Sequence, residues 1–293
     1  MTQAEAERLG LFVLPMPFMI DGQIYLEGVD LTQEEFYRRM EAGADITTSQ
    51  PTPESVTTLW DRLLGEYDQV VHIPMSSGLS GSCQTAMVLA QEYENRVWVV
   101  DNHRISVTQR QSALEARDLA AKGYSGQEIR GILERSGGDS IIYITVDTLK
   151  YLKKGGRITP AAAALGTLLR IKPVLQIAGE KLDAFSKVRT MKQAKTAMLT
   201  ALAKDLAGFL GDPDGTDSYF QVAHTCNDAM AREMKETLAQ LYPGKPVVAA
   251  PLSLSIACPV SYTHLDHDGD HEEDEQGQLQ IDAGQNHKGH RSL

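Results

Sequence analysis

The chain has 293 residues, 42% of them hydrophobic, which is enough for one large or two medium globular domains. Its net charge of −11 at pH 7 argues against nucleic-acid binding. No run of 18 apolar residues and no signal-peptide pattern occurs, so we expect no stable membrane insertion and a cytoplasmic protein. Three widely spaced cysteines without a CxxC pair agree with a reducing compartment.

The N-terminal segment predicts a strand followed by a helix. Leu11–Met16 is apolar and predicts a strand, which Phe18–Ile20 continues to a turn at Asp21-Gly22. A helix is expected from Thr32, because Thr32 and Glu35 have the spacing of a capping box.

A hydroxyl-rich turn precedes the next predicted helix. Thr47, Thr48 and Ser49 come shortly before Thr52 and Pro53, which suit the N-cap and the first position of a helix. Backbone N–H groups at a helix N-terminus, together with hydroxyl donors, favour an anion.

A second turn of this kind follows Val70–Ile73, an apolar run that predicts a buried strand. Between it and the next helix lie four serines and two glycines: Ser76, Ser77, Gly78, Ser80, Gly81 and Ser82. Glycine permits a tight turn and close approach of a ligand. The two turns together predict one site for a carboxylate or a phosphate, although each alone also fits an ordinary capped turn.

Alternating strands and helices predict an N-terminal α/β domain, residues 1–137, with a parallel, doubly wound sheet. The linker candidate is Ser136–Asp139. A C-terminal α/β domain with a mixed sheet is expected over residues 138–258. Its strands are predicted at 140–146, 172–177, 182–188, 219–223 and 246–253, and its helices at 161–169, 189–209 and 228–241.

Residues 259–293 differ in composition from the rest of the chain. They hold eight acidic and two basic residues and five of the eight histidines, a pattern typical of disorder. Asp266–Asp270 only loosely resembles a calcium loop, because Gly269 occupies position 4 rather than 6 and Gly277 stands at position 12. We therefore predict a disordered tail and no metal site.

Standard catalytic signatures are absent. The sequence has no GxxxxGK[ST], GxGxxG, GxSxG or HExxH motif, and we expect no cofactor. One enzymatic alternative stays open, a hydrolase or phosphotransferase with Ser80 or Ser77 as its nucleophile. It needs a base, and His72 is the only histidine close to these serines in sequence.

Five motifs, in order along the chain, resemble the DegV family: Thr48–Pro51, Ser76–Gly81, Val146–Ile158, Ile171–Gln176 and Lys187–Thr190. The resemblance extends over Leu9–Cys258 and implies a two-domain α/β fold that binds a long-chain fatty acid. Several members are FakB, the carrier subunit of a bacterial fatty-acid kinase. Its partner FakA phosphorylates the carboxylate of the carried acid for phospholipid synthesis.

The resemblance also implies roles for particular residues. Thr48 and Ser80 are expected to hydrogen-bond the carboxylate, with further contacts nearby from Ser49, Ser77, Gly78 and the N–H of Gly81. A charge on Arg157 would stabilise an acyl phosphate. Arg189 and Lys192 are expected to contact the phosphate or the kinase partner, with a solvated helix end as the alternative.

A methylene chain needs an apolar tunnel. Each buried CH₂ contributes about 0.8 kcal/mol, so a C16 chain supplies roughly 10 kcal/mol before ordering costs. Ala161–Leu169 and Ile171–Ile177 are candidates for the wall, and both also fit plain core.

The sequence departs from the family pattern at both ends. The strand and Thr-Asp-Ser turn that usually open the family are absent before Met1, so we expect the first domain to lack that strand. The usual His-x-Gly-Pro-Gly segment is replaced from Pro259 onward, which we interpret as a non-native tail in which His264 takes no family role. The main prediction is a carrier without catalysis of its own; a structural or regulatory module with incidental lipid is a further alternative.

Overall fold

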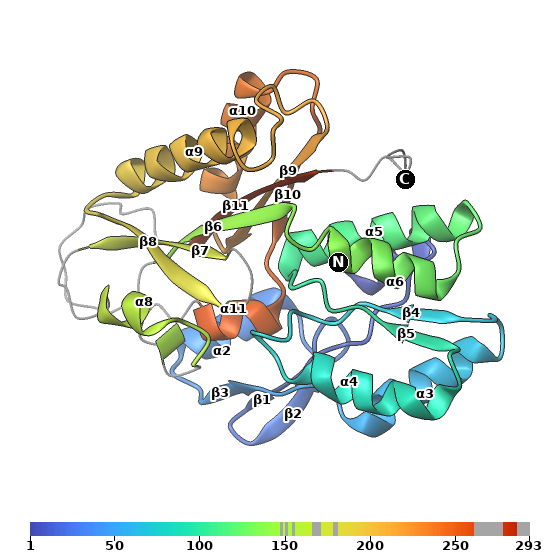
Figure 1. Cartoon of the computed structure of the whole chain (residues 1–293). Helices are drawn as coiled ribbons and strands as arrows, with labels where there is room; N and C mark the ends of the chain where they lie inside the picture. Colours follow the sequence, from blue (N-terminus) through green and yellow to red (C-terminus); the bar gives the residue numbers. More distant parts are fainter. Residues whose placement is uncertain are drawn as a thin grey trace.

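The computed structural model describes residues 1–146, 149, 152–153, 156–165, 171–177, 181–260 and 278–285. Within these ranges the chain forms helices and three sheets, one with strand order β2-β1-β3, one pairing β4 with β5, and one with order β10-β9-β11-β6-β7-β8 (Figure 1). The predicted α/β fold class, with parallel strands in the first half and a mixed sheet in the second, is confirmed.

The first sheet is antiparallel and contains β1 (Pro17–Ile20), β2 (Gln23–Leu26) and β3 (Ile46–Thr48). The strand predicted over Leu11–Met16 is wrong, because these residues have no regular structure and pairing begins at Pro17. Asp21 and Gly22 have φ values of 51° and 81°, which favour a tight hairpin. This turn folds β2 back onto β1. Two helices, α1 (Gln3–Arg8) and α2 (Gln33–Glu41), belong to the same part of the chain.

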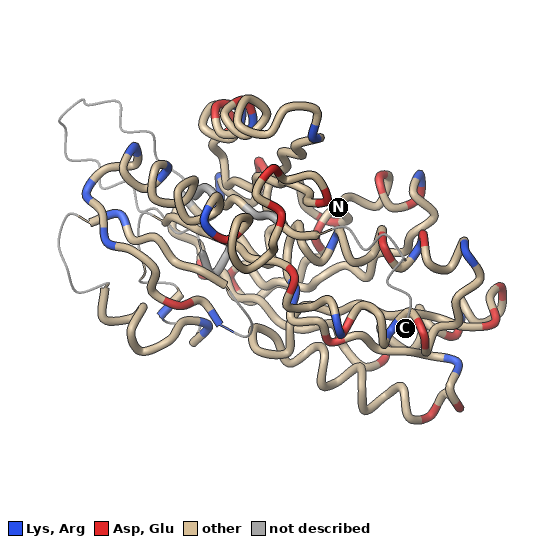
Figure 2. The backbone as a smooth tube through the Cα atoms, turned by 45° about the horizontal axis from the view of Figure 1, so that its top comes forward, with Lys and Arg blue, Asp and Glu red and all other residues tan. Residues whose placement is uncertain are grey.

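The second sheet pairs β4 (Val70–His72) in parallel with β5 (Val97–Val99). Helices lie on both sides of this pair in Figure 1, as expected of wound α/β structure. On one side are α3 (Pro53–Leu64), α4 (Ser82–Ala90) and the short 3₁₀ helix η1 (Gln91–Tyr93); on the other are α5 (Ser106–Ala121) and α6 (Gly126–Arg135). Acidic and basic residues are interspersed along the helices of this half (Figure 2).

The six-stranded sheet combines a parallel pair, β9 and β10, with antiparallel neighbours. Its strands are β6 (Ser140–Thr145), β7 (Lys172–Ile177), β8 (Leu182–Val188), β9 (Ser218–Thr225), β10 (Val247–Pro251) and β11 (Gln278–Gln285). The amphipathic helices α9 (Met191–Ala207) and α10 (Asp228–Leu241) pack on one face. The short helices α8 (Pro160–Leu165) and α11 (Leu254–Val260) lie in the other part of the molecule, towards α2 (Figure 1).

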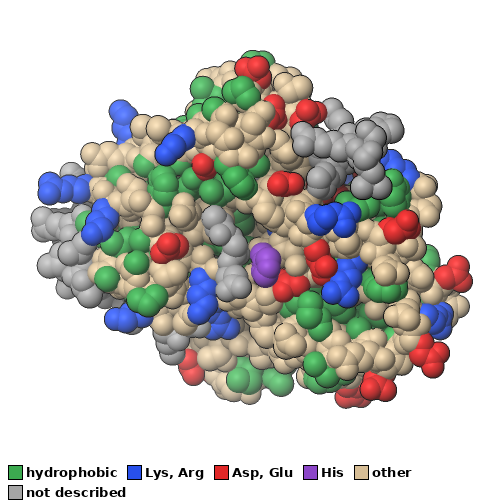
Figure 3. All heavy atoms as spheres, in the orientation of Figure 1, with side chains coloured by type: hydrophobic (Ala, Val, Ile, Leu, Met, Phe, Trp, Pro, Cys, Tyr) green, Lys and Arg blue, Asp and Glu red, His purple; other side chains and the backbone are tan. Residues whose placement is uncertain are grey.

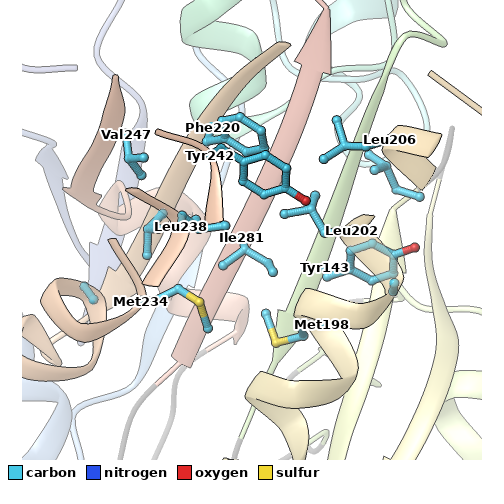
Figure 4. Packing of buried hydrophobic residues seen from close by; sticks show 14 of the residues in the cluster. Tyr143, Met198, Leu202, Leu206, Phe220, Met234, Leu238, Tyr242, Val247 and Ile281 are labelled. Atoms are coloured by element: carbon cyan, nitrogen blue, oxygen red, sulfur yellow. The ribbon is translucent and has the colours of Figure 1, made fainter. Parts of the chain in front are cut away.

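The prediction that all of residues 259–293 is disordered is wrong for Gln278–Gln285. This segment forms β11, which pairs antiparallel with both β6 and β9 and supplies the backbone partners that two inner strands need. Ile281 is fully buried and points between side chains of α9 and α10 (Figure 4). The low hydrophobicity of residues 259–293 as a whole concealed one short segment, Gln278–Gln285, whose alternating residues fit the two faces of a sheet.

Contacts between distant segments join the first half of the chain to α11. The side-chain amide of Gln33 donates to the Leu252 carbonyl at 2.9 Å. The carboxylate of Glu27 accepts hydrogen bonds from the N–H groups of Leu254 and Ser255 at 2.7 and 3.3 Å. Leu254 is buried in the core of the first sheet, together with Phe18. These contacts fix α11 beside β3. No described helix is long and apolar enough to cross a bilayer.

Candidate functional site

A cavity of about 270 Å³ lies where the two hydroxyl-rich turns, α11 and one face of the six-stranded sheet meet. Its wall is polar at the turns and mainly apolar at the sheet. The described lining residues are Met16, Thr48, Ser49, Gln50, Met75, Leu79, Ser80, Gly81, Ile105, Ser106, Ile144, Leu152, Arg157, Ile177, Leu182, Ser255, Ile256 and Gln280. Such a wall suits a ligand with one polar end and an apolar body.

The first turn brings Thr48 and Ser49 to the cavity. Thr48 ends β3 opposite Phe18, and its side chain is half-buried. The Ser49 N–H donates to the Pro17 carbonyl at 3.2 Å, which continues the β1–β3 pairing by one residue. Thr52 then caps α3 by accepting from the Ser55 N–H at 3.2 Å. Sheet pairing on one side and a helix cap on the other hold this turn in place.

The second turn brings Ser80 and Gly81 to the same cavity. The Ser76 carbonyl accepts from the N–H groups of Leu79 and Ser80, both at 3.0 Å, so the chain folds tightly before α4. The Ser80 hydroxyl donates to Ser82 Oγ at 3.0 Å and accepts from the Ser82 N–H at 3.2 Å. Gly81 is the N-cap of α4 and makes no side-chain cap. The N-terminal end of α4 therefore opens toward the cavity, with favourable electrostatics for an anion.

Gln50 joins the two turns. Its Nε2 donates to Thr85 Oγ1 on α4 at 3.0 Å, and a Cβ at Gly81 would lie 3.1 Å from its Oε1. A larger residue at Gly81 would push this amide away. Gln50 belongs to the motif Thr48–Pro51, but no local pattern indicated that it connects the two helix starts.

Ser77 and Gly78 lie outside the cavity wall. Ser77 is exposed, and its N–H donates to Asp101 Oδ1 at 3.3 Å. The Gly78 N–H donates to Ser76 Oγ at 3.3 Å. Both residues shape the turn on the side away from the lining, so the structure does not bring all of the expected carboxylate contacts together.

Arg157 is the one charged residue among the described residues that line the cavity. It is half-buried, and its Nε donates to the Leu79 carbonyl at 3.4 Å. A residue from the second half of the chain thus reaches the turn before α4. Its guanidinium adds a positive charge to the polar end of the cavity.

Arg189 and Lys192 lie elsewhere. Both are exposed, next to Thr190, the N-cap of α9, and neither lines the cavity. Basic side chains gather over the side of the molecule that contains β8, α8 and α9 (Figure 3). Both residues therefore lie away from the enclosed cavity.

The geometry gives no support to a serine enzyme based on His72. The ring of His72 packs edge-on against Trp60, with centroids 5.4 Å apart, and burial lowers its pKa to about 4. His72 does not line the cavity, and no histidine is among the described lining residues. The Ser80 hydroxyl donates to Ser82 instead. Neither serine is paired with the expected base.

The sequence predicted the apolar wall only in part. Ile177 from the expected stretch Ile171–Ile177 lines the cavity, whereas the described part of Ala161–Leu169 does not, and its remainder lies outside the described residues. Further wall residues come from β6, β8, α11 and β11, and no local pattern links these four elements. Ser255 and Ile256 lie near the end of the predicted C-terminal domain, and their place in the wall depends on the packing of α11.

Comparison with known proteins places this architecture in a family. The profile described as "Uncharacterised protein, DegV family" matches residues 1–261. A DegV domain-containing protein of Deinococcus radiodurans is 36% identical over 195 residues, 66% of this chain and 69% of that protein. A DegV domain-containing protein of Streptomyces coelicolor is 30% identical over 239 residues, 81% of this chain and 83% of the relative.

Solved structures agree over nearly the full length. A DegV family protein of Thermus thermophilus, described as fatty acid binding, has a TM-score of 0.81 and 29% identity, covering 97% of this chain and 95% of that one. DegV of Bacillus subtilis, described as a fatty acid binding protein, has a TM-score of 0.82 and 25% identity; the match covers 98% of this chain and 95% of that one. The resemblance of the five motifs is confirmed, and the chain belongs to the DegV family.

Proposed function

We propose that this protein binds a long-chain fatty acid in the cavity and presents its carboxylate to a fatty-acid kinase. The observation that carries the proposal is the cavity itself, in which hydroxyls, a helix N-terminus and Arg157 form one end and an apolar sheet face forms the wall. Fatty acid binding by the Thermus and Bacillus relatives supports it.

The carboxylate is assigned to the turns. Thr48 supplies a hydroxyl donor, and Ser80 supplies a second when its proton turns from Ser82 Oγ to the ligand; Ser49 and the N–H of Gly81 lie beside them. Arg157 supplies the charge that a carboxylate, and still more an acyl phosphate, requires. Ser77 and Gly78 act indirectly, by holding the turn in shape through their bonds to Asp101 and Ser76.

The apolar wall supplies most of the affinity. Ile144, Ile177 and Leu182 belong to one buried cluster and line the cavity together. Burial of a C16 chain contributes roughly 10 kcal/mol before the costs of association. The protein is then a cytoplasmic carrier that needs neither a cofactor nor a nucleophile of its own.

Native mass spectrometry of the purified protein tests the binding step. We expect a stoichiometric adduct with the mass of a C14–C18 fatty acid, and its loss in the double variant Thr48→Ala/Ser80→Ala. Ser77→Ala is the matched control and should retain the lipid, because Ser77 is exposed and outside the wall. A folded protein that carries no lipid and takes up none contradicts the proposal.

The kinase step needs a separate experiment. With a purified fatty-acid kinase subunit and ATP, Arg189→Glu/Lys192→Glu should slow acyl phosphate formation while leaving fatty-acid affinity unchanged. Lys235→Glu, an exposed lysine on α10, serves as the charge-matched control. Lipid binding without phosphorylation by any kinase subunit would favour the regulatory alternative.

A further inference from the structure

The cavity wall contains a buried amide whose nitrogen has no partner among the described residues. Gln280 on β11 lines the cavity and is 2% exposed, and its Nε2 donates to no described residue. A buried N–H group without an acceptor is costly, so native interiors supply a protein atom, a water or a ligand. This residue lies outside the part of the chain that matches the family profile.

Strand register fixes the direction of this amide. Gln280 lies opposite Ile144 on β6 and Ala223 on β9, and directly opposite residues project from the same face. The next residue, Ile281, is buried in the core on the other face. Turning the amide into that core would require a one-residue slip of the whole strand.

The surroundings of Gln280 along the sheet are apolar. Ile144, Ile177 and Leu182 line the same cavity and belong to one hydrophobic cluster. Gln50, the other amide of the lining, is exposed and bonded to Thr85. Among the described lining residues that belong to the six-stranded sheet, Gln280 therefore supplies the one side-chain donor, at a place where an acyl chain, rather than its head group, is expected to lie.

The following inference rests on the proposed function. We propose that Gln280 forms a polar subsite for an acyl chain that has a hydroxyl or keto oxygen part-way along its length. The Nε2 of Gln280 donates a hydrogen bond to that oxygen. A plain methylene chain leaves the same N–H unpaired. A site built to bond a ligand oxygen rejects the analogue that lacks it.

The test compares octadecanoic acid with its monohydroxy and monoketo derivatives, with the oxygen at successive carbons. Binding to the full chain is measured by displacement of a fluorescent fatty acid. We expect an oxygen at one position to increase affinity about ten-fold over the plain acid, the effect of one buried hydrogen bond. Preference for either oxygen class supports the subsite.

Two glutamine variants localise the effect. Gln280→Met keeps the length of the side chain and should lose the preference while still binding the plain acid. Gln221→Met is the matched control: Gln221 is also 2% exposed on the same sheet face, with an Oε1 that has no described partner, but it does not line the cavity. It should keep the preference.

Equal affinity for plain and oxygenated acids at every position overturns the proposal, and a water then satisfies the amide. This comparison uses the unaltered protein, so it stands even where a variant fails to fold. An unchanged preference in Gln280→Met also overturns it. Failure of the unaltered protein to bind any acid, the plain one included, contradicts the proposed function instead.

Discussion

At the scale of single residues, Arg157 has the largest expected effect on the ligand. It brings a guanidinium from the second half of the chain to the Leu79 carbonyl, next to the turn that holds Ser80. Replacing it should remove a charge-assisted bond to the carboxylate, which is worth about 1.5–3 kcal/mol.

Arg157→Ala should therefore weaken fatty-acid binding by about ten-fold or more, and Arg157→Lys by less, as measured by displacement of a fluorescent fatty acid. The matching fatty alcohol, which has no carboxylate, provides the control. Its affinity should be the same for both variants and the unaltered protein. An equal loss for acid and alcohol would show that Arg157 acts on the cavity's shape.

His72 makes stability depend on pH. Burial lowers its pKa from 6.5 to about 4, so between these values the unfolded chain binds a proton that the folded chain does not. The free energy of unfolding should consequently fall as pH drops through this window, by about 1–3 kcal/mol from pH 7.5 to 4.5.

Urea unfolding at the two pH values measures this loss. His72→Phe keeps the aromatic contact with Trp60 and removes the titrating group. The free energy of unfolding of this variant should therefore fall less between pH 7.5 and 4.5, by the amount that His72 contributes. Burial also lowers the pKa of His224, which therefore titrates in the same direction. Its contribution to the pH dependence of stability is the same in both proteins. An identical pH dependence of both proteins would refute the assignment.

At the scale of secondary-structure elements, β11 is decisive for the six-stranded sheet. It bonds to β6 and β9 on its two sides, and Ile281 is completely buried among α9 and α10 (Figure 4). Gly284 lies directly opposite Tyr219, so close to its ring that no Cβ would fit. Backbone pairing, one buried side chain and one glycine together determine its register.

Ile281→Ala should lower the free energy of unfolding by about 2–4 kcal/mol, because it leaves a cavity in a packed core. The matched control is Ile24→Ala, because Ile24 also lies in a strand but is 66% exposed. This variant should change the free energy of unfolding by less than about 0.5 kcal/mol. Denaturant unfolding followed by circular dichroism measures both. Equal small effects would mean that β11 adds little to the sheet.

At the scale of the whole molecule, the cavity joins segments that are far apart in the chain. Thr48 and Ser80 reach it from the first half, and Arg157 and Gln280 from the second. A ligand that binds only the folded arrangement stabilises it by mass action, by about 2.7 kcal/mol at a free concentration one hundred times Kd.

Saturating fatty acid should therefore raise Tm by several degrees in differential scanning calorimetry. Thr48→Ala/Ser80→Ala should show little rise at the same ligand concentration. An increase of equal size in this variant would place the head group away from the two turns.

The two turns, their helix caps and the α/β class follow from the sequence because they depend on local chemistry. Thr52 caps α3 and Thr190 caps α9, and such bonds span only three residues. The hydroxyl-rich turns likewise owe their form to neighbouring serines and glycines. Family motifs added the expectation that the turns serve a carboxylate.

Which of these residues share a cavity depends on how distant segments pack. Ser80 lines it and Ser77 does not, although the two are three positions apart, because the turn directs Ser77 toward solvent near Asp101. The placement of β11 and Gln280 likewise depends on strands more than 50 residues distant in sequence. Strand pairing and burial are set by distant partners, which a local pattern does not encode.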